Sequence, residues 1–236
     1  MPDPSALSTG FGELEAGPTV RVRVWDLPTR LFHWALALAV TVQVVTGLAG
    51  VMEWHFRSGY LVLALLLFRL IWGFVGGHWS RFASFLYSPS ALFGYLKGRA
   101  HPEQQVGHTP LGALSVFALL ALLLAQVATG LVADDEISAS GPLTRFVSSA
   151  TVSLASAWHA VVGKWIVLAL VALHVLAIAF YAVARHQHLV KPMFSGDKLL
   201  THAAAASRDS AGSRVLALVI FGACAGFAYW ISSLRL

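Results

Sequence analysis

A long apolar stretch, WHAVVGKWIVLALVALHVLAIAFYAVA at 158–184, constrains the fold more than any other part of the sequence. Its length and apolarity are typical of a helix that spans a lipid bilayer. The stretch contains two histidines, His159 and His174, fifteen residues apart. Helical geometry puts their imidazoles about 22 Å apart along the axis and turned by only about 60°. Both rings are therefore expected on one side of the helix, one near each membrane surface.

The composition agrees with a membrane protein. Hydrophobic residues make up 57% of the chain and charged residues only 11%, with a mean hydropathy of +0.71. A soluble domain carries about 25% charged residues. The first twenty residues have no cationic and apolar segments of the kind found in a secretory signal, so the first apolar segment is expected to direct insertion. No internal repeat is evident.

Five segments are apolar and long enough to span a membrane. They are 31–52, 59–77, 111–133, 158–184 and 214–234. We therefore predict an all-α integral membrane bundle, with a four-helix core and one additional C-terminal transmembrane helix. The expected organisation is a cytoplasmic tail at 1–21, the core at 22–198, a cytoplasmic linker at 199–213 and the additional helix at 214–236.

The loops between these segments predict the orientation of the chain. Lys and Arg favour cytoplasmic loops. With five spans, one side carries Arg21, Arg23, Arg30, Arg81, Lys97, Arg99, Arg185, Lys191, Lys198 and Arg208. The other side carries Arg57, Arg145 and Arg235 against Glu53, Asp134, Asp135 and Glu136. We expect a cytoplasmic N-terminus and an external C-terminus. The net charge of +5 then reflects topology and indicates no nucleic-acid partner.

The ligand types available to a metal are few. The only cysteine, Cys224, excludes an internal disulfide, covalent haem attachment through CxxCH and iron–sulfur ligation by several cysteines. Histidines number ten and methionines three. Any metal chemistry is therefore expected to run through imidazole.

Four histidines are expected to form two pairs, with the two members of each pair at the same depth in the membrane. His55 and His159 are expected on the external side, and His33 and His174 on the cytoplasmic side. Haem iron with two axial imidazoles has no open position and carries electrons. The four side chains would make two such haem b sites. A single histidine at a helix end is more often interfacial, but an imidazole inside an apolar span, such as His174, is usually functional.

Two glycines and two cations complete the candidate site. Gly59 and Gly163 each follow a histidine by four residues, where a missing side chain leaves room for a porphyrin edge or for close helix packing. Arg69 and Lys164 suit haem propionates, and Arg69 also suits a quinone head group. The alternative for both cations is snorkelling to lipid head groups.

The remaining histidines are weaker candidates. His186 and His188 form an HxH pair that lacks two further ligands nearby in the sequence. His78, His101, His108 and His202 are expected to face cytoplasmic solvent or head groups.

Several motifs together resemble the prokaryotic cytochrome b561 family, which includes the cytochrome b subunits of nickel–iron hydrogenases. They are VRVWDLPTRLFHW at 22–34, HFRSGYLVLALLLFRLIWGFVG at 55–76, RFASF at 81–85, GHTPLGALSV at 107–116, WHAVVGKW at 158–165, LHVLAIAFY at 173–181 and HLVKPMFSG at 188–196. The resemblance covers about 22–198. The chain departs from the family in reading GHTPLG where Asn is more usual before the proline, and in its fifth span.

The resemblance implies a four-helix membrane bundle with two haems b, whose ligands fall on His33, His55, His159 and His174. It also implies electron transfer between a quinone pool and a redox partner, either a c-type cytochrome or a periplasmic redox subunit, in the inner membrane. Two alternatives stay open. One is a superoxide oxidase with a cationic funnel from Arg57 and Lys164, which the acidic run that starts at Asp134 disfavours. The other is a non-catalytic membrane anchor.

Overall fold

The computed structural model describes residues 19–99 and 101–235, so most of the expected N-terminal tail lies outside the described residues. Five helical segments are long and apolar enough to cross a membrane: Leu27–Leu48, Met52–Val75, Pro110–Val132, Ser149–Ala184 and Ala211–Ser232. These are α1, α2 and α4, then α5 (Ser149–Ala157) continued by α6 (Lys164–Ala184), and finally α8. The predicted helical membrane bundle is confirmed.

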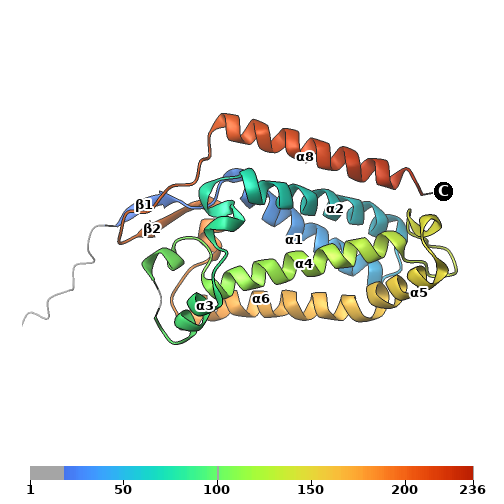
Figure 1. Cartoon of the computed structure of the whole chain (residues 1–236), viewed down its shortest axis with the longest axis horizontal. Coiled ribbons are helices and arrows are strands. Elements are labelled where there is room, and N and C mark those ends of the chain that lie inside the picture. The colour runs from blue at the N-terminus through green and yellow to red at the C-terminus, as the bar shows by residue number, and fades with distance from the viewer. Residues whose placement is uncertain (1–18, 100, 236) are drawn as a thin grey trace, which may run out of the picture.

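The helices run along the long axis of the molecule, with α8 on the outside of α2 (Figure 1). Shorter elements lie at the two ends. One end holds α3 (Pro89–Leu96), β1 (Val20–Arg23) and β2 (Asp197–Leu200), and the other holds α5 (Figure 1). The remaining elements are η1 (His78–Ser80), η2 (Phe82–Ser84), η3 (Pro102–Gln105), η4 (Thr144–Phe146), η5 (Trp158–Gly163) and α7 (Val190–Ser195).

Local sequence explains where the helices begin. Asp26 precedes α1 and its carboxylate accepts a hydrogen bond from the Thr29 amide at 2.8 Å, with Pro28 in the first turn. Thr109 caps α4 in the same way, with Pro110 as its first residue. An oxygen-bearing cap followed by proline satisfies free amides and presets the helical φ angle.

All five spans begin earlier than predicted from hydropathy, and two of them do so by seven or more residues. Helix α2 starts at Met52 rather than at 59, so His55 lies in its first turn and not in a polar loop. The fourth span starts at Ser149 rather than at 158, because Ser148 caps α5 and the chain stays helical through Trp158. Polar residues in these first turns hid the starts from a hydropathy pattern.

Helix α2 is the centre of the bundle. It packs against α1, α4 and α8, and it supplies more residues of the main buried core than any other helix, including the fully buried Leu66 and Trp72. Helix α6, by contrast, exposes an apolar face that includes Leu173, Leu176 and Val183. Such a face suits contact with lipid. The fifth span, α8, docks on α2 through Ala217, Cys224 and Ala228.

A small antiparallel sheet holds the ends of the core together. β1 pairs with β2 in a register that joins Val20 to Leu200 and Arg23 to Asp197. The expected boundary between core and linker at 198/199 therefore falls inside a strand. The linker also packs on the core: the Ser207 amide and hydroxyl donate to the Arg23 and Val24 carbonyls, both at 2.7 Å.

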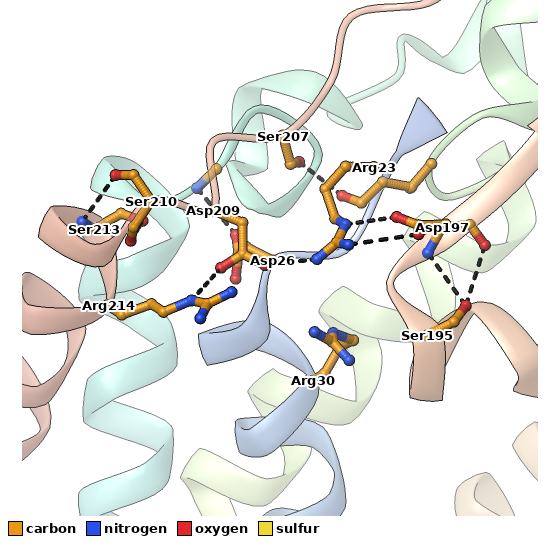
Figure 2. A network of polar contacts seen from close by, with 12 residues as sticks. Arg23, Asp26, Arg30, Ser195, Asp197, Ser207, Asp209, Ser210, Ser213 and Arg214 are labelled. Atoms are coloured by element: carbon orange, nitrogen blue, oxygen red, sulfur yellow. Dashed lines mark hydrogen bonds and ion pairs between the residues drawn. The ribbon is translucent and has the colours of Figure 1, made fainter. Parts of the chain in front are cut away.

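An ionic network ties this sheet to α8 (Figure 2). Arg23 donates to Asp197 at 2.5 Å and to Asp209 at 2.8 Å, and Asp209 also accepts from Arg214 in the first turn of α8 at 2.9 Å. Burial by itself would raise the pKa of Asp209, but hydrogen bonds from Arg214, the Leu27 backbone and Arg23 lower it below its usual value. The network links three segments that are far apart in the chain.

Candidate functional site

His55 and His159 face each other between α2 and the π-helical turn η5. Their ring centroids lie 6.0 Å apart and their planes are inclined by 80°. Two imidazole nitrogens that each bind one first-row metal ion at about 2 Å lie about 4 Å apart, which puts the ring centroids about 6 Å apart. The spacing therefore fits one metal ion between the rings.

The protonation of these two rings follows from their hydrogen bonds. His55 Nδ1 lies 3.1 Å from the Gln43 carbonyl oxygen, and His159 Nδ1 lies 2.8 Å from the Gln126 carbonyl oxygen. A carbonyl oxygen only accepts, so each Nδ1 is the donor. In a neutral imidazole the other nitrogen, Nε2, then carries the free lone pair. Both rings are thus set in the tautomer that binds a metal through Nε2.

Each of the two glutamines makes a second contact with the same histidine. Gln43 Nε2 donates to the His55 carbonyl at 2.6 Å, and Gln126 Nε2 donates to the His159 carbonyl at 2.8 Å. Each glutamine therefore holds its histidine by the ring and by the backbone. Neither glutamine was predicted from the sequence.

An internal repeat underlies this symmetry and corrects the expectation that the sequence holds none. QVVTGL at 43–48 matches QVATGL at 126–131, and WHFRSG at 54–59 matches WHAVVG at 158–163. In both copies the threonine of the QVxTGL motif donates its hydroxyl to the helix backbone. The ring of the histidine in the WHxxxG motif bonds to the backbone carbonyl of the glutamine in the QVxTGL motif. The repeat was the signal that could have identified the glutamines.

Glycines in this repeat leave space for the side chains of the site. A Cβ on Gly47 would lie 3.1 Å from the His55 ring, and one on Gly130 would lie 2.6 Å from the His159 ring. A Cβ on Gly59 would lie 2.8 Å from Gln43 Nε2, and one on Gly163 would lie 2.1 Å from Gln126 Oε1. Gly59 and Gly163 thus adjoin glutamine side chains rather than open space, and their contact with a porphyrin stays a prediction.

A cavity of about 310 Å³ surrounds the two rings. Its lining is mostly apolar, with Gly47, Gly59 and Gly130 beside the histidines. Lys164, Asp134 and Asp135 also line it. Lys164 therefore lines the same cavity as His55 and His159. The Lys164 ammonium lies 5.5 Å from the centroid of the Trp165 ring. An apolar cavity with a charged edge suits a flat hydrophobic cofactor with acidic substituents.

His33 of α1 and His174 of α6 are the second predicted pair. His33 Nδ1 is buried and has no hydrogen-bond partner among the described residues. A buried polar atom without a partner is rare and calls for a bound group or an ordered water. The structure thus brings His55 and His159 together, and the pairing of His33 with His174 stays a prediction.

Arg69 is the buried cation of this inner region. It is 3% exposed, its guanidinium carbon lies 4.7 Å from the centroid of the Phe82 ring, and its Nη1 has no partner within the described part of the chain. The nearby carboxylate of Asp26 already accepts hydrogen bonds from Thr29, Trp72, Gly77 and Ser80. A buried, incompletely paired guanidinium calls for an anion.

His108 corrects the expectation that it faces solvent or head groups. Its ring packs between Trp25 and Phe85, with centroid distances of 4.7 Å and 4.4 Å. Burial, with a smaller contribution from Arg69 and Lys198, lowers the pKa of His108 to about 3. The aromatic neighbours come from segments distant in sequence, which hid this burial. His108 is therefore neutral at physiological pH.

Other metal sites are not indicated where the structure describes the chain. No group of three or more His, Cys, Asp or Glu side chains there could hold a metal ion. His188 of the HxH pair is exposed. The fold and the site define a class: a membrane-spanning helical bundle that holds a pair of facing imidazoles, His55 and His159, at an internal cavity.

The chain belongs to the prokaryotic cytochrome b561 family, whose model matches residues 24–196. It is 26% identical to a probable Ni/Fe-hydrogenase B-type cytochrome subunit of Azotobacter chroococcum, over 81% of this chain and 94% of the relative. A protein of the same description from Bradyrhizobium diazoefficiens is 27% identical over 84% of this chain and 94% of the relative. No solved structure was found to match the chain. Family membership implies that haem b is bound and makes the chain a membrane cytochrome of the b type.

Proposed function

We propose that this chain holds two haems b and carries electrons one at a time through the membrane between quinone and a redox enzyme partner. The observation that carries the proposal is the His55–His159 pair, with ring centroids 6.0 Å apart and both Nδ1 atoms committed to backbone carbonyls. Two imidazoles on one iron leave no open position for a substrate, so such a centre serves electron transfer.

The ligand assignment follows the two pairs. His55 and His159 would hold the external haem, and His33 and His174 the cytoplasmic one. The haems supply reversible one-electron redox chemistry when bound. The chain's own residues orient the imidazoles, since Gln43 and Gln126 fix the two external rings. Apolar side chains make up most of the cavity lining around the rings.

The cations are proposed as partners for haem propionates. Arg69, buried and with Nη1 unpaired, suits a propionate of the inner haem, and Lys164 suits one of the outer haem. Donation of a hydrogen bond to the carbonyl oxygen of a quinone head group beside the inner haem is the other role proposed for Arg69. Removal of the Arg69 charge in Arg69→Gln should lower the midpoint potential of the inner haem, because a nearby cation favours the reduced iron.

The proposed partner is a redox enzyme on the external side. Relatives are described as probable Ni/Fe-hydrogenase B-type cytochrome subunits, which supports a redox enzyme as the partner. A periplasmic oxidoreductase or a c-type cytochrome is the finer proposal. We propose an orientation in the inner membrane with the N-terminus cytoplasmic and the C-terminus external. This proposal rests on the distribution of Lys and Arg among the loops. Asp134 and Asp135 at the external cavity disfavour superoxide, an anion, as the electron donor.

Haem counting in matched variants tests the proposal. We expect two haems b per purified chain by pyridine haemochrome, and one in each of His33→Ala and His159→Ala, with different midpoint potentials for the haem that remains. His188→Ala, at an exposed histidine, is the control and should keep two. Two haems in His159→Ala would overturn the pairing. No haem in the unmodified chain would favour a non-catalytic anchor.

A further inference from the structure

A second cavity, of about 660 Å³, lies between α2 and the end of α8. Phe56, Arg57 and Tyr60 of α2 line one side, and Tyr229, Ser232 and Arg235 line the other. Helix α8 lies outside the family-matched residues 24–196, so this cavity is an addition to the family's bundle. It is distinct from the haem cavity, although Phe56 and Tyr60 line both.

The cavity sits at the level of the lipid head groups. Helix α2 has 24 residues, and at about 1.5 Å per residue its length of about 36 Å exceeds the hydrocarbon core of about 30 Å. Its first turn, with Arg57 just after it, therefore reaches the head-group region. Tyr229 and Trp230 near the end of α8 are exposed aromatic residues of the type that anchors helices at this depth.

The lining carries an excess of positive charge. Arg57 and Arg235 supply two guanidinium groups, and Glu53 supplies one carboxylate, which leaves one net positive charge. Glu53 pairs with Arg57 at 2.7 Å. Arg235 forms no ion pair with any carboxylate of the described residues, and its guanidinium carbon lies 3.7 Å from the centroid of the Phe56 ring. This cation is held in place by an aromatic ring and is available to an anion.

A hydrogen-bond donor in the cavity also lacks an acceptor. The Tyr60 hydroxyl is buried and has no partner among residues 19–99 and 101–235. Deeper in the cavity, Ala64, Ala225 and Ala228 give a smooth apolar floor. The cavity thus combines a cationic mouth, one free hydroxyl and an apolar base, which are the three features that a phosphate with attached acyl chains requires.

We propose that this cavity binds the phosphate head group of one anionic phospholipid, with the phosphate on Arg235 and Tyr60 and the acyl chains along Ala64 and Ala225. A quinone fits the net positive charge less well, because its head group is neutral whereas a phosphate is an anion. The bound lipid would bridge α2 and α8 at the external surface. This site does not depend on the dihaem proposal.

Lipid binding to the full, haem-loaded chain in neutral detergent tests the site. Native mass spectrometry with added phosphatidylglycerol should show one tightly retained lipid per chain. Phosphatidylcholine should bind at least about tenfold more weakly, and Arg235→Gln and Tyr60→Phe should each weaken phosphatidylglycerol binding by about tenfold, the worth of one charge-assisted hydrogen bond. The haem spectrum should be unchanged in Arg235→Gln, because Arg235 does not line the haem cavity, and this shows that the variant folds. Tyr60 lines both cavities, so the folding of Tyr60→Phe is checked by its Tm instead.

The control is Arg145→Gln. Arg145 is predicted on the same side of the membrane, stacks on Phe146 with its guanidinium carbon 4.8 Å from the ring centroid, and does not line the cavity. An equal loss of lipid in this control would show general charge attraction and overturn the site. Competition by inorganic phosphate at equal concentration, or displacement of the lipid by a short-chain quinone, would also overturn it.

Discussion

Gln43 and Gln126 make the same pair of contacts on opposite sides of the external histidine pair. Each accepts a ring N–H at its backbone carbonyl and donates its side-chain amide to the backbone carbonyl of the same histidine. The imidazoles are therefore oriented by α1 and α4, helices that carry neither external ligand. Such support fixes ligand geometry before a metal binds.

Replacement of Gln126 by leucine should weaken the external centre. The His159 carbonyl loses its donor, at a cost of about 1–3 kcal/mol, whereas the His159 ring keeps its bond to the Gln126 backbone carbonyl. We expect a lower occupancy of one haem and a shift in its midpoint potential, measured by pyridine haemochrome and redox titration. The inner haem serves as the internal reference. An equal loss of both haems would contradict the local role of Gln126.

A methyl group at Gly130 should have a larger effect. Its Cβ would lie 2.6 Å from the His159 ring, closer than real side-chain contacts permit, so Gly130→Ala must displace the ligand. We expect loss of the external haem with the inner one retained. Gly222→Ala is the matched control, because a Cβ at Gly222 on α8 meets no heavy atom within 4 Å. Full haem content in Gly130→Ala would show that the ring does not occupy this position.

Asp209→Asn should destabilise the junction between β1 and α8. Asp209 accepts from Arg23 and Arg214 with only 6% of its side chain exposed. Because both arginines are partly solvated, we expect a loss of about 1–2 kcal/mol and a Tm lower by about 2–8 °C. Glu136→Gln, at an exposed position, should leave the Tm unchanged.

The pH dependence of this junction has a defined sign. The pKa of Asp209 is lowered in the folded chain. Its contribution to stability is therefore fully present above the ordinary Asp value of about 3.9 and is lost as the pH falls through the lower folded pKa. Melting curves between pH 7 and pH 3 should show the difference between Asp209→Asn and the unmodified chain shrinking only at the acid end. A constant difference over the whole range would argue against ionic pairing.

His108→Phe should make the protein more resistant to mild acid. The folded pKa of His108 is about 3, whereas an unfolded histidine titrates near about 6.5. Between these values the unfolded state binds more protons, so stability falls as the pH drops below about 6.5. Phenylalanine keeps the aromatic packing on Trp25 and Phe85 and cannot be protonated.

The Tm advantage of His108→Phe should grow as the pH is lowered from 7 to 5. His188→Phe, at an exposed histidine, should show no such trend. If both variants responded alike to pH, His108 would not be the titrating group.

Much of the fold could be predicted from sequence because spanning helices are encoded locally. The apolar stretch around His174 is long enough by itself to indicate a span, and a fifteen-residue interval sets the depths of His159 and His174 on one helix face. The five spans and the family were therefore predictable. Helix starts were less so, since Glu53 in the first turn of α2 and the serines of α5 are polar residues that a hydropathy pattern assigns to loops.

The sequence by itself determined which segments are long and apolar enough to cross a membrane, because hydrophobic length and helical period are properties of single segments. Tertiary structure decided which groups meet: His55 across from His159, Gln126 beside His159, His108 between Trp25 and Phe85, and α8 against α2. These contacts depend on how each helix is rotated and packed against its neighbours, and that rotation is a property of the whole bundle.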